Sequence, residues 1–180
     1  EILKELDTRA LHVLDLEEFA CHRGSAFGSM GLPKQPSQKN FDALVWQKLR
    51  EVESGVVFME AESRKIGRIL LPEFIYKRII SSKTILITGT IEKRVERIIA
   101  DYLSTTSPEQ LEAGLAHLAG LKERVGSERV KHIRDVVLSG DLRSGVKILL
   151  TEYYDPLYSK QIEAHAPFFL EVSGDNPAEA

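Results

Sequence analysis

Short apolar runs alternate with segments of helical spacing along most of the chain. Four runs have the length of strands: Leu11–Leu16, Val56–Met59, Thr84–Thr88 and Phe168–Val172. The first three are short and almost wholly apolar, which is typical of buried strands in a parallel sheet. Strands that alternate with helices predict an α/β fold, a parallel sheet flanked by helices.

The segments between these runs repeat apolar residues every three or four positions. Ser37 to Glu51 is predicted to be a helix with Phe41, Leu44, Val45 and Leu49 on one face. A second helix follows the third strand, with Ile91, Val95, Ile98 and Tyr102 on one face. The first six residues also have helical spacing but no capping residue precedes them, so we expect a helix whose beginning is missing.

The region from about 105 to 165 has helical patterns only. It is predicted to be a helical subdomain, inserted before the last strand of an α/β domain that spans 1–173. Ser107-Pro108-Glu109-Gln110 has the pattern of a capping box. Gly126-Ser127 and Gly140-Asp141 are each predicted to end one helix and cap the next. The tail, residues 174–180, is predicted to be disordered.

Two predicted strands lead into loops that contain Arg and Ser. His22-Arg23-Gly24-Ser25 follows the first strand, and Glu60–Arg68 follows the second. Ligands of parallel α/β sheets bind beyond the carboxyl ends of the strands, so these loops should share one crevice. Arg, Ser and backbone N–H groups suit phosphate oxygens. The sequence therefore predicts a phosphate or polyphosphate site with Arg23 and Arg64 in one pocket.

Each side chain of the first loop has a candidate role. Arg23 could neutralise an oxyanion, and Ser25 could bond that anion or a metal. His22 could act as an acid, a base or a hydrogen-bond donor. Gly24 lets the backbone approach a ligand closely. The structural alternative is a glycine-rich loop whose Arg forms only a salt bridge.

The second loop begins with a carboxylate and contains three cations. Glu60 directly follows four apolar residues, where a phosphate-site carboxylate would hold a water on Mg²⁺. Arg64 and Arg68 could clamp one anionic group together. The other candidates in this loop are Glu62, Ser63 and Gly67. The alternative interpretation is a solvated turn held by salt bridges.

Two further clusters are candidates for binding. Ser37 is expected to cap its helix, which would leave free N–H groups for an anion near Gln35, Gln38 and Lys39. Capping alone would also explain Ser37. In the segment 153–158, Tyr154 and its neighbouring tyrosines could stack on bases or cover an apolar ligand. Asp155 is a candidate beside Tyr154, and Asp155-Pro156 is predicted to end a helix.

Composition narrows these possibilities. A chain of 180 residues fits one domain, and a net charge of −3 argues against a generally basic nucleic-acid coat. A local basic run remains, either a solvated helix face or an RNA contact: Lys122, Arg124, Arg129, Lys131 and Arg134. The single cysteine, Cys21, excludes an internal disulfide and a Cys-rich zinc site. No apolar stretch approaches the roughly 20 residues that span a bilayer, and we expect a cytoplasmic protein without a membrane partner.

Five short motifs occur in an order and spacing that resemble one known family. They are Leu14-Asp15-Leu16-Glu17, His22–Gly28, Gln35–Phe41, Glu62–Gly67 and Tyr153–Pro156. Together they look like the C-terminal P-loop domain of bacterial tRNA 2-selenouridine synthase, and the resemblance covers nearly the whole chain. Each motif alone is weak, but the ordered set is specific.

The resemblance implies a tRNA-modifying transferase. Such enzymes attach a geranyl group from geranyl diphosphate to the wobble 2-thiouridine of a tRNA, and then exchange it for selenium from selenophosphate. The crevice would hold either co-substrate near the anticodon. Arg23, Arg64 and Arg68 would stabilise the diphosphate leaving group, and Ser25 and Glu60 would position phosphate or Mg²⁺.

This chain departs from the family in two respects. The family has an N-terminal rhodanese-like domain with a catalytic cysteine and a glycine-rich Walker A loop, and neither is found here. We therefore expect a part that is inactive alone and needs a rhodanese-like domain in cis or in trans. Two alternatives stay open: a non-catalytic tRNA-binding module that works with a separate rhodanese-like subunit, and a nucleotide kinase-like fragment.

Overall fold

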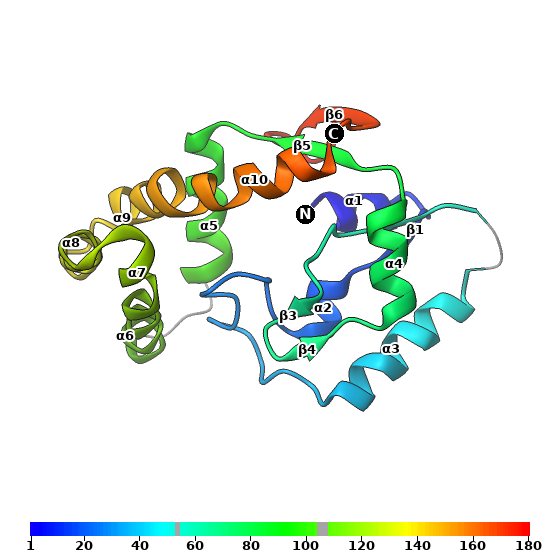
Figure 1. Cartoon of the computed structure of the whole chain (residues 1–180), viewed down its shortest axis with the longest axis horizontal. Coiled ribbons are helices and arrows are strands. Elements are labelled where there is room, and N and C mark those ends of the chain that lie inside the picture. The colour runs from blue at the N-terminus through cyan, green and yellow to red at the C-terminus, as the bar shows by residue number, and fades with distance from the viewer. Residues whose placement is uncertain (53–54, 104–107) are drawn as a thin grey trace. The chain divides into compact units, whose positions relative to one another are not determined.

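Helices and short strands alternate through the first half of the chain, and helices fill most of the second half (Figure 1). The structure is a computed structural model that describes residues 1–52, 55–103 and 108–180. The chain divides into two compact units. The first comprises Glu1–Ile87 and Phe169–Ala180, and the second comprises Thr88–Phe168. No described helix has the length and apolar character that crossing a membrane requires.

Within the described residues, the first unit contains the strands and four of the helices. In order, its elements are α1 (Ile2–Thr8), β1 (His12–Leu14), α2 (Leu16–Ala20), α3 (Gln38–Arg50), β2 (Val57–Met59), β3 (Lys65–Ile66), β4 (Ile69–Leu70), α4 (Glu73–Ser81), β5 (Ile85–Thr88) and β6 (Leu170–Ser173). The predicted α/β fold is confirmed, and each predicted strand lies within two residues of an observed one.

The strands pair two by two. β1 and β2 are parallel, with His12 opposite Val57 and Leu14 opposite Met59. β3 and β4 form an antiparallel hairpin that the sequence analysis missed, because each strand has only two residues. β5 pairs with β6. The expectation that the first three strands are buried holds for Val13 and Leu14 of β1, but β2 is only half-buried and the last two residues of β5 are exposed.

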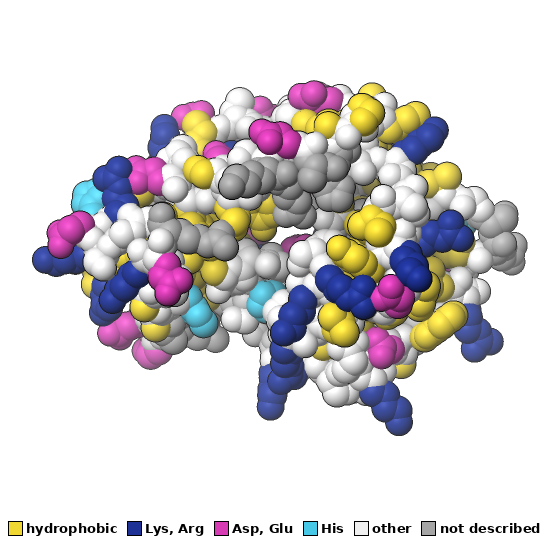
Figure 2. Space-filling model, viewed as in Figure 1, with side chains coloured by type: hydrophobic (Ala, Val, Ile, Leu, Met, Phe, Trp, Pro, Cys, Tyr) yellow, Lys and Arg dark blue, Asp and Glu magenta, His cyan; other side chains and the backbone are white. Residues whose placement is uncertain are grey.

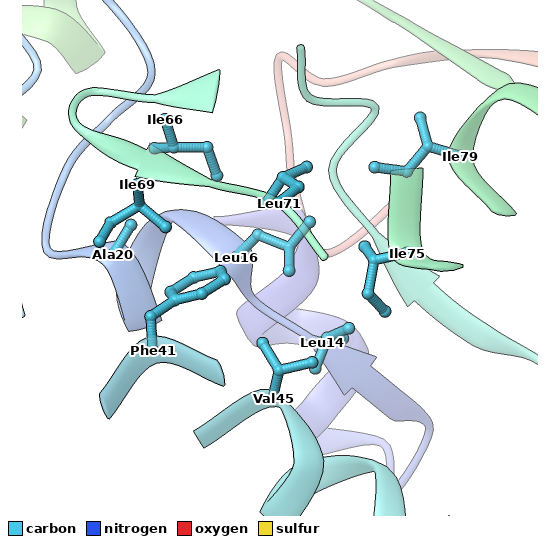
Figure 3. Packing of buried hydrophobic residues seen from close by; sticks show 10 residues of the cluster. All are labelled: Leu14, Leu16, Ala20, Phe41, Val45, Ile66, Ile69, Leu71, Ile75 and Ile79. Carbon is cyan, nitrogen blue, oxygen red and sulfur yellow. The ribbon is translucent and has the colours of Figure 1, made fainter. Parts of the chain in front are cut away.

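The core of the first unit lies between α3, α4 and the β1 and β4 regions. Figure 3 shows Phe41 and Val45 of α3 pointing toward Leu14 and Leu16, and all four side chains are completely buried. Leu16 was predicted to end a strand but begins α2, because the Asp15 side chain accepts a hydrogen bond from Glu18 N and caps a helix there. The apolar face of α3 is confirmed except at Leu44, which is 40% exposed.

Among the described residues of the second unit, every element after β5 is helical, which agrees with the predicted helical insertion before the last strand. Its elements are α5 (Ile91–Leu103), α6 (Pro108–Ala116), a 3₁₀ turn (His117–Leu121), α7 (Lys122–Val125), α8 (Ser127–Leu138), α9 (Leu142–Leu149), a π-helical turn (Leu150–Tyr154) and α10 (Asp155–His165). Leu118, Ile133 and Val95 are buried within it.

The helix ends of this unit test the predicted caps. Asp141 caps α9 and accepts a hydrogen bond from Ser144 N at 3.0 Å, as predicted. The cap predicted at Ser127 is wrong, because Gly126 occupies the N-cap position and Ser127 is already helical. The predicted end of a helix at Asp155-Pro156 is also wrong: α10 begins there, and Pro156 lies in the first turn, where no N–H is needed. The capping box at Ser107 lies outside the described residues.

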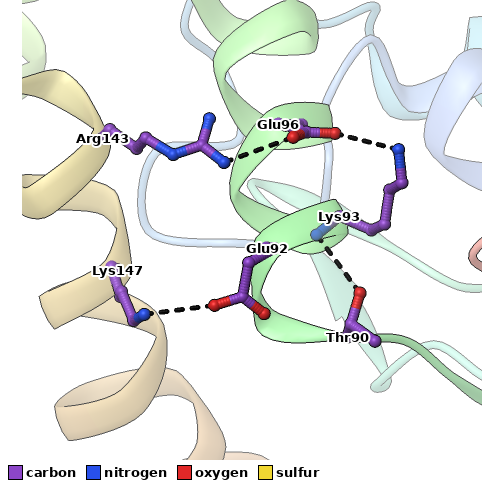
Figure 4. A network of polar contacts seen from close by, with 6 residues as sticks. All are labelled: Thr90, Glu92, Lys93, Glu96, Arg143 and Lys147. Carbon is purple, nitrogen blue, oxygen red and sulfur yellow. Dashed lines mark hydrogen bonds and ion pairs between the residues drawn. The ribbon is translucent and has the colours of Figure 1, made fainter.

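Ion pairs join α5 to α9 across their exposed faces (Figure 4). Lys147 Nζ lies 3.2 Å from Glu92 Oε1, and Arg143 Nη2 lies 3.2 Å from Glu96 Oε1. Lys93 Nζ lies 3.1 Å from the other carboxylate oxygen of Glu96. Exposed pairs of this kind contribute little to stability, because solvent screens their charges. They orient α9 against α5 more than they stabilise the unit.

Candidate active site at the ends of two parallel strands

The parallel strands β1 and β2 end side by side, and the loops that follow them are joined by hydrogen bonds. Glu60 directly follows β2, and its carboxylate accepts a hydrogen bond from Leu16 N at 2.9 Å and one from Glu17 N at 3.3 Å. These N–H groups belong to the first turn of α2, just after β1. The predicted meeting of the two loops at one edge is therefore confirmed.

Three glutamates gather at this junction, and their carboxyls titrate abnormally. Burial, followed by the nearby negative charges of Glu62 and Glu60, raises the pKa of Glu17 to about 8. Burial raises the pKa of Glu60 to about 7, although the hydrogen bond from Leu16 N opposes the shift. Burial also raises the pKa of Glu62. At neutral pH this carboxyl cluster (Glu17, Glu60 and Glu62) carries less negative charge than its sequence indicates.

Gly24 brings the first loop against the carboxyl cluster. Its φ is +64°, a conformation that favours glycine. A Cβ atom at this position would lie 2.7 Å from Glu62 Oε1 and 3.1 Å from Glu17 Oε1. The close backbone approach that the sequence predicts at Gly24 is present, and the groups approached are carboxyl oxygens.

The His22 ring packs closely against two glycines, Gly28 and Gly67. A Cβ at Gly28 would lie 2.7 Å from His22 Nδ1, and a Cβ at Gly67 would lie 2.8 Å from His22 Cδ2. Both glycines are needed for the ring to fit. Burial, with a smaller contribution from the charge of Arg23, lowers the pKa of His22. Its Nδ1 is buried and makes no hydrogen bond with the described residues.

Gln35 ties three segments together. Its Nε2 donates to Ala20 O and to Ile66 O, both at 3.1 Å, and its Oε1 accepts from Arg68 N at 2.9 Å. Gln38 connects α3 to β4 in the same way, with bonds of 2.8 Å to Leu70 O and 2.9 Å from Leu70 N. Both glutamines therefore hold the loops in place through their amide groups.

The three arginines predicted to grip an anion each contact the protein itself. Arg23 Nη1 donates to Met30 O at 2.7 Å. Arg64 forms an ion pair with Glu73, and its guanidinium lies 5.2 Å from the centre of the Tyr76 ring. Arg68 donates to the main-chain oxygens of Gln35 and Pro36. The structure thus joins the backbones of the loops but gives each guanidinium its own protein partner.

The remaining predicted residues of the first unit have local roles. Ser37 caps α3, as predicted, because its Oγ accepts from Asn40 N at 3.2 Å. Ser63 Oγ donates to Lys65 O at 2.8 Å within the second loop. Ser25 lies in a tight turn in which its own N–H donates to Arg23 O at 2.7 Å. Lys39 is exposed in the first turn of α3.

Tyr154 and Asp155 belong to the second unit. The Asp155 carboxylate accepts from both terminal nitrogens of Arg94, at 2.5 and 3.1 Å. The Tyr154 ring lies 4.9 Å from that of Tyr153 and 6.2 Å from that of Tyr158. This π-helical turn and its aromatic cluster are built within one unit, and π-helical turns are frequent at functional positions.

Glu17 is the residue of this site that the sequence analysis did not select. It lies in one of the motifs that carry the family resemblance, and the signal that could have found it is its position directly after the first predicted strand, Leu11–Leu16. Among the described residues, no group of three or more His, Cys, Asp or Glu side chains has an arrangement that could hold a metal ion.

Comparison with known proteins identifies similar chains. The model of the family described as the tRNA 2-selenouridine synthase AAA domain matches residues 1–177. A protein named tRNA 2-selenouridine synthase from Marinobacter nauticus is 33% identical over 83% of this chain and 48% of its own length. One of the same name from Pseudomonas entomophila is 31% identical over 97% of this chain and 53% of its own length. The chain spans about half the length of these relatives, and no solved structure matches it.

Proposed function

Because the chain belongs to the tRNA 2-selenouridine synthase AAA domain family, we propose that it serves a tRNA-modifying transferase as the domain that holds the anionic co-substrate. The reaction is geranylation of the wobble 2-thiouridine and its conversion to 2-selenouridine. Geranyl diphosphate and selenophosphate are the co-substrates. A rhodanese-like domain, in cis or in trans, and the anticodon region of the tRNA are the partners.

The observation that carries this proposal is the junction of three motif-bearing loops. The segments 22–28, 35–38 and 60–68 contact one another beyond the carboxyl ends of β1 and β2. Ligands of α/β folds bind at such ends. Residues far apart in the sequence are thereby held in one place by the close backbone approaches at the loop glycines and by the hydrogen bonds of the Gln35 and Gln38 side chains.

The charge state of this junction supports anion binding. Carboxylates would repel a diphosphate, but the raised pKa values of Glu17 and Glu60 leave much of the carboxyl cluster protonated near neutral pH. A protonated carboxyl can donate a hydrogen bond to a phosphate oxygen. Arg23 is the closest cation in sequence to Gly24 and would stabilise the charge that develops on a diphosphate leaving group.

The test is geranyl transfer by the protein together with its rhodanese-like domain, with 2-thiouridine-containing tRNA as the acceptor. Mass spectrometry of the digested tRNA measures the geranylated nucleoside. We expect Arg23→Ala to lower the rate by roughly 100-fold, the usual effect of removing one electrostatic donor. Arg9→Ala is the matched control, because Arg9 also donates to a main-chain oxygen, that of Ala178.

Two results would count against the role of Arg23. A wild-type rate in Arg23→Ala means that this guanidinium takes no part in the reaction. An equal loss in Arg9→Ala means that any lost arginine disturbs the fold. Thermal unfolding of both variants and of Arg23→Lys, which keeps the charge, separates a chemical effect from lost stability.

A further inference from the structure

Two large aromatic side chains are exposed together on the outer side of α3 and α4. Trp46 is 56% exposed and Phe74 is 38% exposed. Their ring centres lie 5.1 Å apart and their planes are inclined by 36°. Isolated exposed apolar residues are ordinary, but a contiguous pair of aromatic rings is a feature of binding surfaces.

Other residues of α3 and α4 fill the core of the first unit. Phe41 and Val45 turn the other face of α3 inward and are completely buried, and Ile75 and Ile79 do the same for α4. Trp46 and Phe74 therefore contact each other without being needed to fill the interior. Much of the surface of the Trp46 ring is left for another molecule.

The surroundings of the pair are cationic, although the chain as a whole carries a net charge of −3. Within their bounds, α3 and α4 carry more cations than carboxylates: Lys39, Lys48, Arg50, Lys77 and Arg78 against Asp42 and Glu73. In Figure 2, Lys and Arg side chains lie among hydrophobic ones over this part of the first unit, with a few Asp and Glu side chains between them. Lys48 is paired with Asp7 and Glu51, and Lys77 with Glu73. Exposed rings among cations fit a polyanion with flat apolar groups.

We propose that Trp46 and Phe74 form a stacking platform for unpaired bases of an RNA strand, with the cations of α3 and α4 on its phosphates. Every base has a π-face that stacks on an aromatic ring, and surrounding Lys and Arg follow the backbone. This inference rests on the proposed function, which makes tRNA the partner. It adds the surface that receives an unpaired segment of that tRNA.

The test is the affinity of the protein for a tRNA transcript at fixed salt, for the wild type and for variants of Trp46, Phe74 and Phe169. Loss of a stacking ring typically weakens single-strand binding by about 5- to 100-fold, which we expect for Trp46→Ala and Phe74→Ala. Trp46→Phe keeps a ring and should bind within about threefold of the wild type. Phe169→Ala is the matched control, because Phe169 is 61% exposed and lies beside Lys83 but on another segment.

A second measurement tests the role of the cations. Arg78→Ala should reduce the slope of log Kd against log salt by about one, as the loss of one phosphate contact does. An unchanged slope removes Arg78 from the platform and leaves the rings without the electrostatic support that the proposal requires. Circular dichroism of each variant verifies that its helices are retained.

The outcomes separate this inference from the proposed function. Wild-type affinity in both Trp46→Ala and Phe74→Ala overturns the platform and leaves a tRNA-binding domain with another surface. Wild-type affinity in Trp46→Leu shows that an apolar side chain without a ring suffices, which overturns base stacking and with it the platform. Failure of the wild-type protein to bind tRNA at all contradicts the proposed function itself.

Discussion

Glu17→Gln tests the carboxyl cluster at the ends of β1 and β2 through the pH dependence of stability. Burial and the neighbouring Glu62 and Glu60 raise the pKa of Glu17 from 4.5 to about 8. The folded protein therefore holds a proton on this side chain that the unfolded chain releases near pH 4.5. Gln keeps the size of the side chain and remains neutral at every pH.

The direction in which stability changes with pH follows from proton linkage. Because the folded pKa is raised, the contribution of Glu17 to stability is fully present below pH 4.5 and is lost as the pH rises through about 8. The full shift corresponds to at most about 5 kcal/mol. Between pH 7 and pH 8.5 the wild type should lose about 1 kcal/mol more than Glu17→Gln.

Urea unfolding at several pH values between 7 and 8.5 measures this difference. The chain has one tryptophan, Trp46, which lies in the first unit, so its fluorescence reports on that unit. The folded pKa of His22 is lowered from 6.5, so above pH 7 it adds little slope, and that slope is the same in the wild type and in Glu17→Gln. Glu18→Gln is the matched control: Glu18 is the next residue of α2, and its side chain is exposed.

One result would refute the reasoning. If the free energies of unfolding of the wild type and of Glu17→Gln run parallel from pH 7 to pH 8.5, Glu17 holds no extra proton in the folded state. The protonated carboxyl cluster, and with it the charge argument for anion binding, would then be wrong. A change of slope in Glu18→Gln of the same size would show that the effect is not specific to the buried carboxyl.

Two further changes probe the packing around the site, and a third probes an ion pair of the second unit. Gly67→Ala should destabilise the first unit by about 1–3 kcal/mol, because φ is +56° and the new Cβ would overlap Gln35 Oε1; Gly55→Ala, where φ is also positive but nothing lies within 4 Å of the new Cβ, should lower the urea midpoint less. Gln35→Ala leaves Ile66 O, Ala20 O and Arg68 N without their amide partner and should cost about 1–3 kcal/mol in the same assay, and wild-type stability would contradict its tying role. Arg94→Ala removes the two bonds to Asp155 at the start of α10 and should lower the melting temperature of the second unit; an unchanged melting temperature would show that the pair is fully screened by solvent.

The elements of the fold could be predicted where the sequence has a clear period. The helical spacing of Phe41 and Val45 and the capping residue Ser37 place α3 within one residue at each end. The hairpin of β3 and β4 could not be found in this way, because two-residue strands have no period. The π-helical turn at Leu150–Tyr154 leads directly into α10, which has Pro156 in its first turn. The sequence analysis expected a helix end there, because the residue before a proline usually disfavours helical backbone angles.

The site was predictable in its location but not in its internal contacts. The order of strands and loops was sufficient to bring the loops around Arg23 and Glu60 to one edge of β1 and β2. The partner of each polar group depends on side-chain distances that one sequence does not specify. Gln35, considered for binding an anion, instead connects loop backbones, and Arg64 pairs with Glu73 of α4. For the same reason Glu17 was overlooked.

The most direct test of the account is calorimetric titration of the protein with geranyl diphosphate, for the wild type and for Arg23→Ala. We expect saturable binding at one site in the wild type and at least roughly tenfold weaker binding without the guanidinium, since charge-assisted hydrogen bonds to phosphate are the strong ones. Equal affinity of the two proteins, or no binding by the folded wild type, would contradict the claim that the joined loops hold a diphosphate.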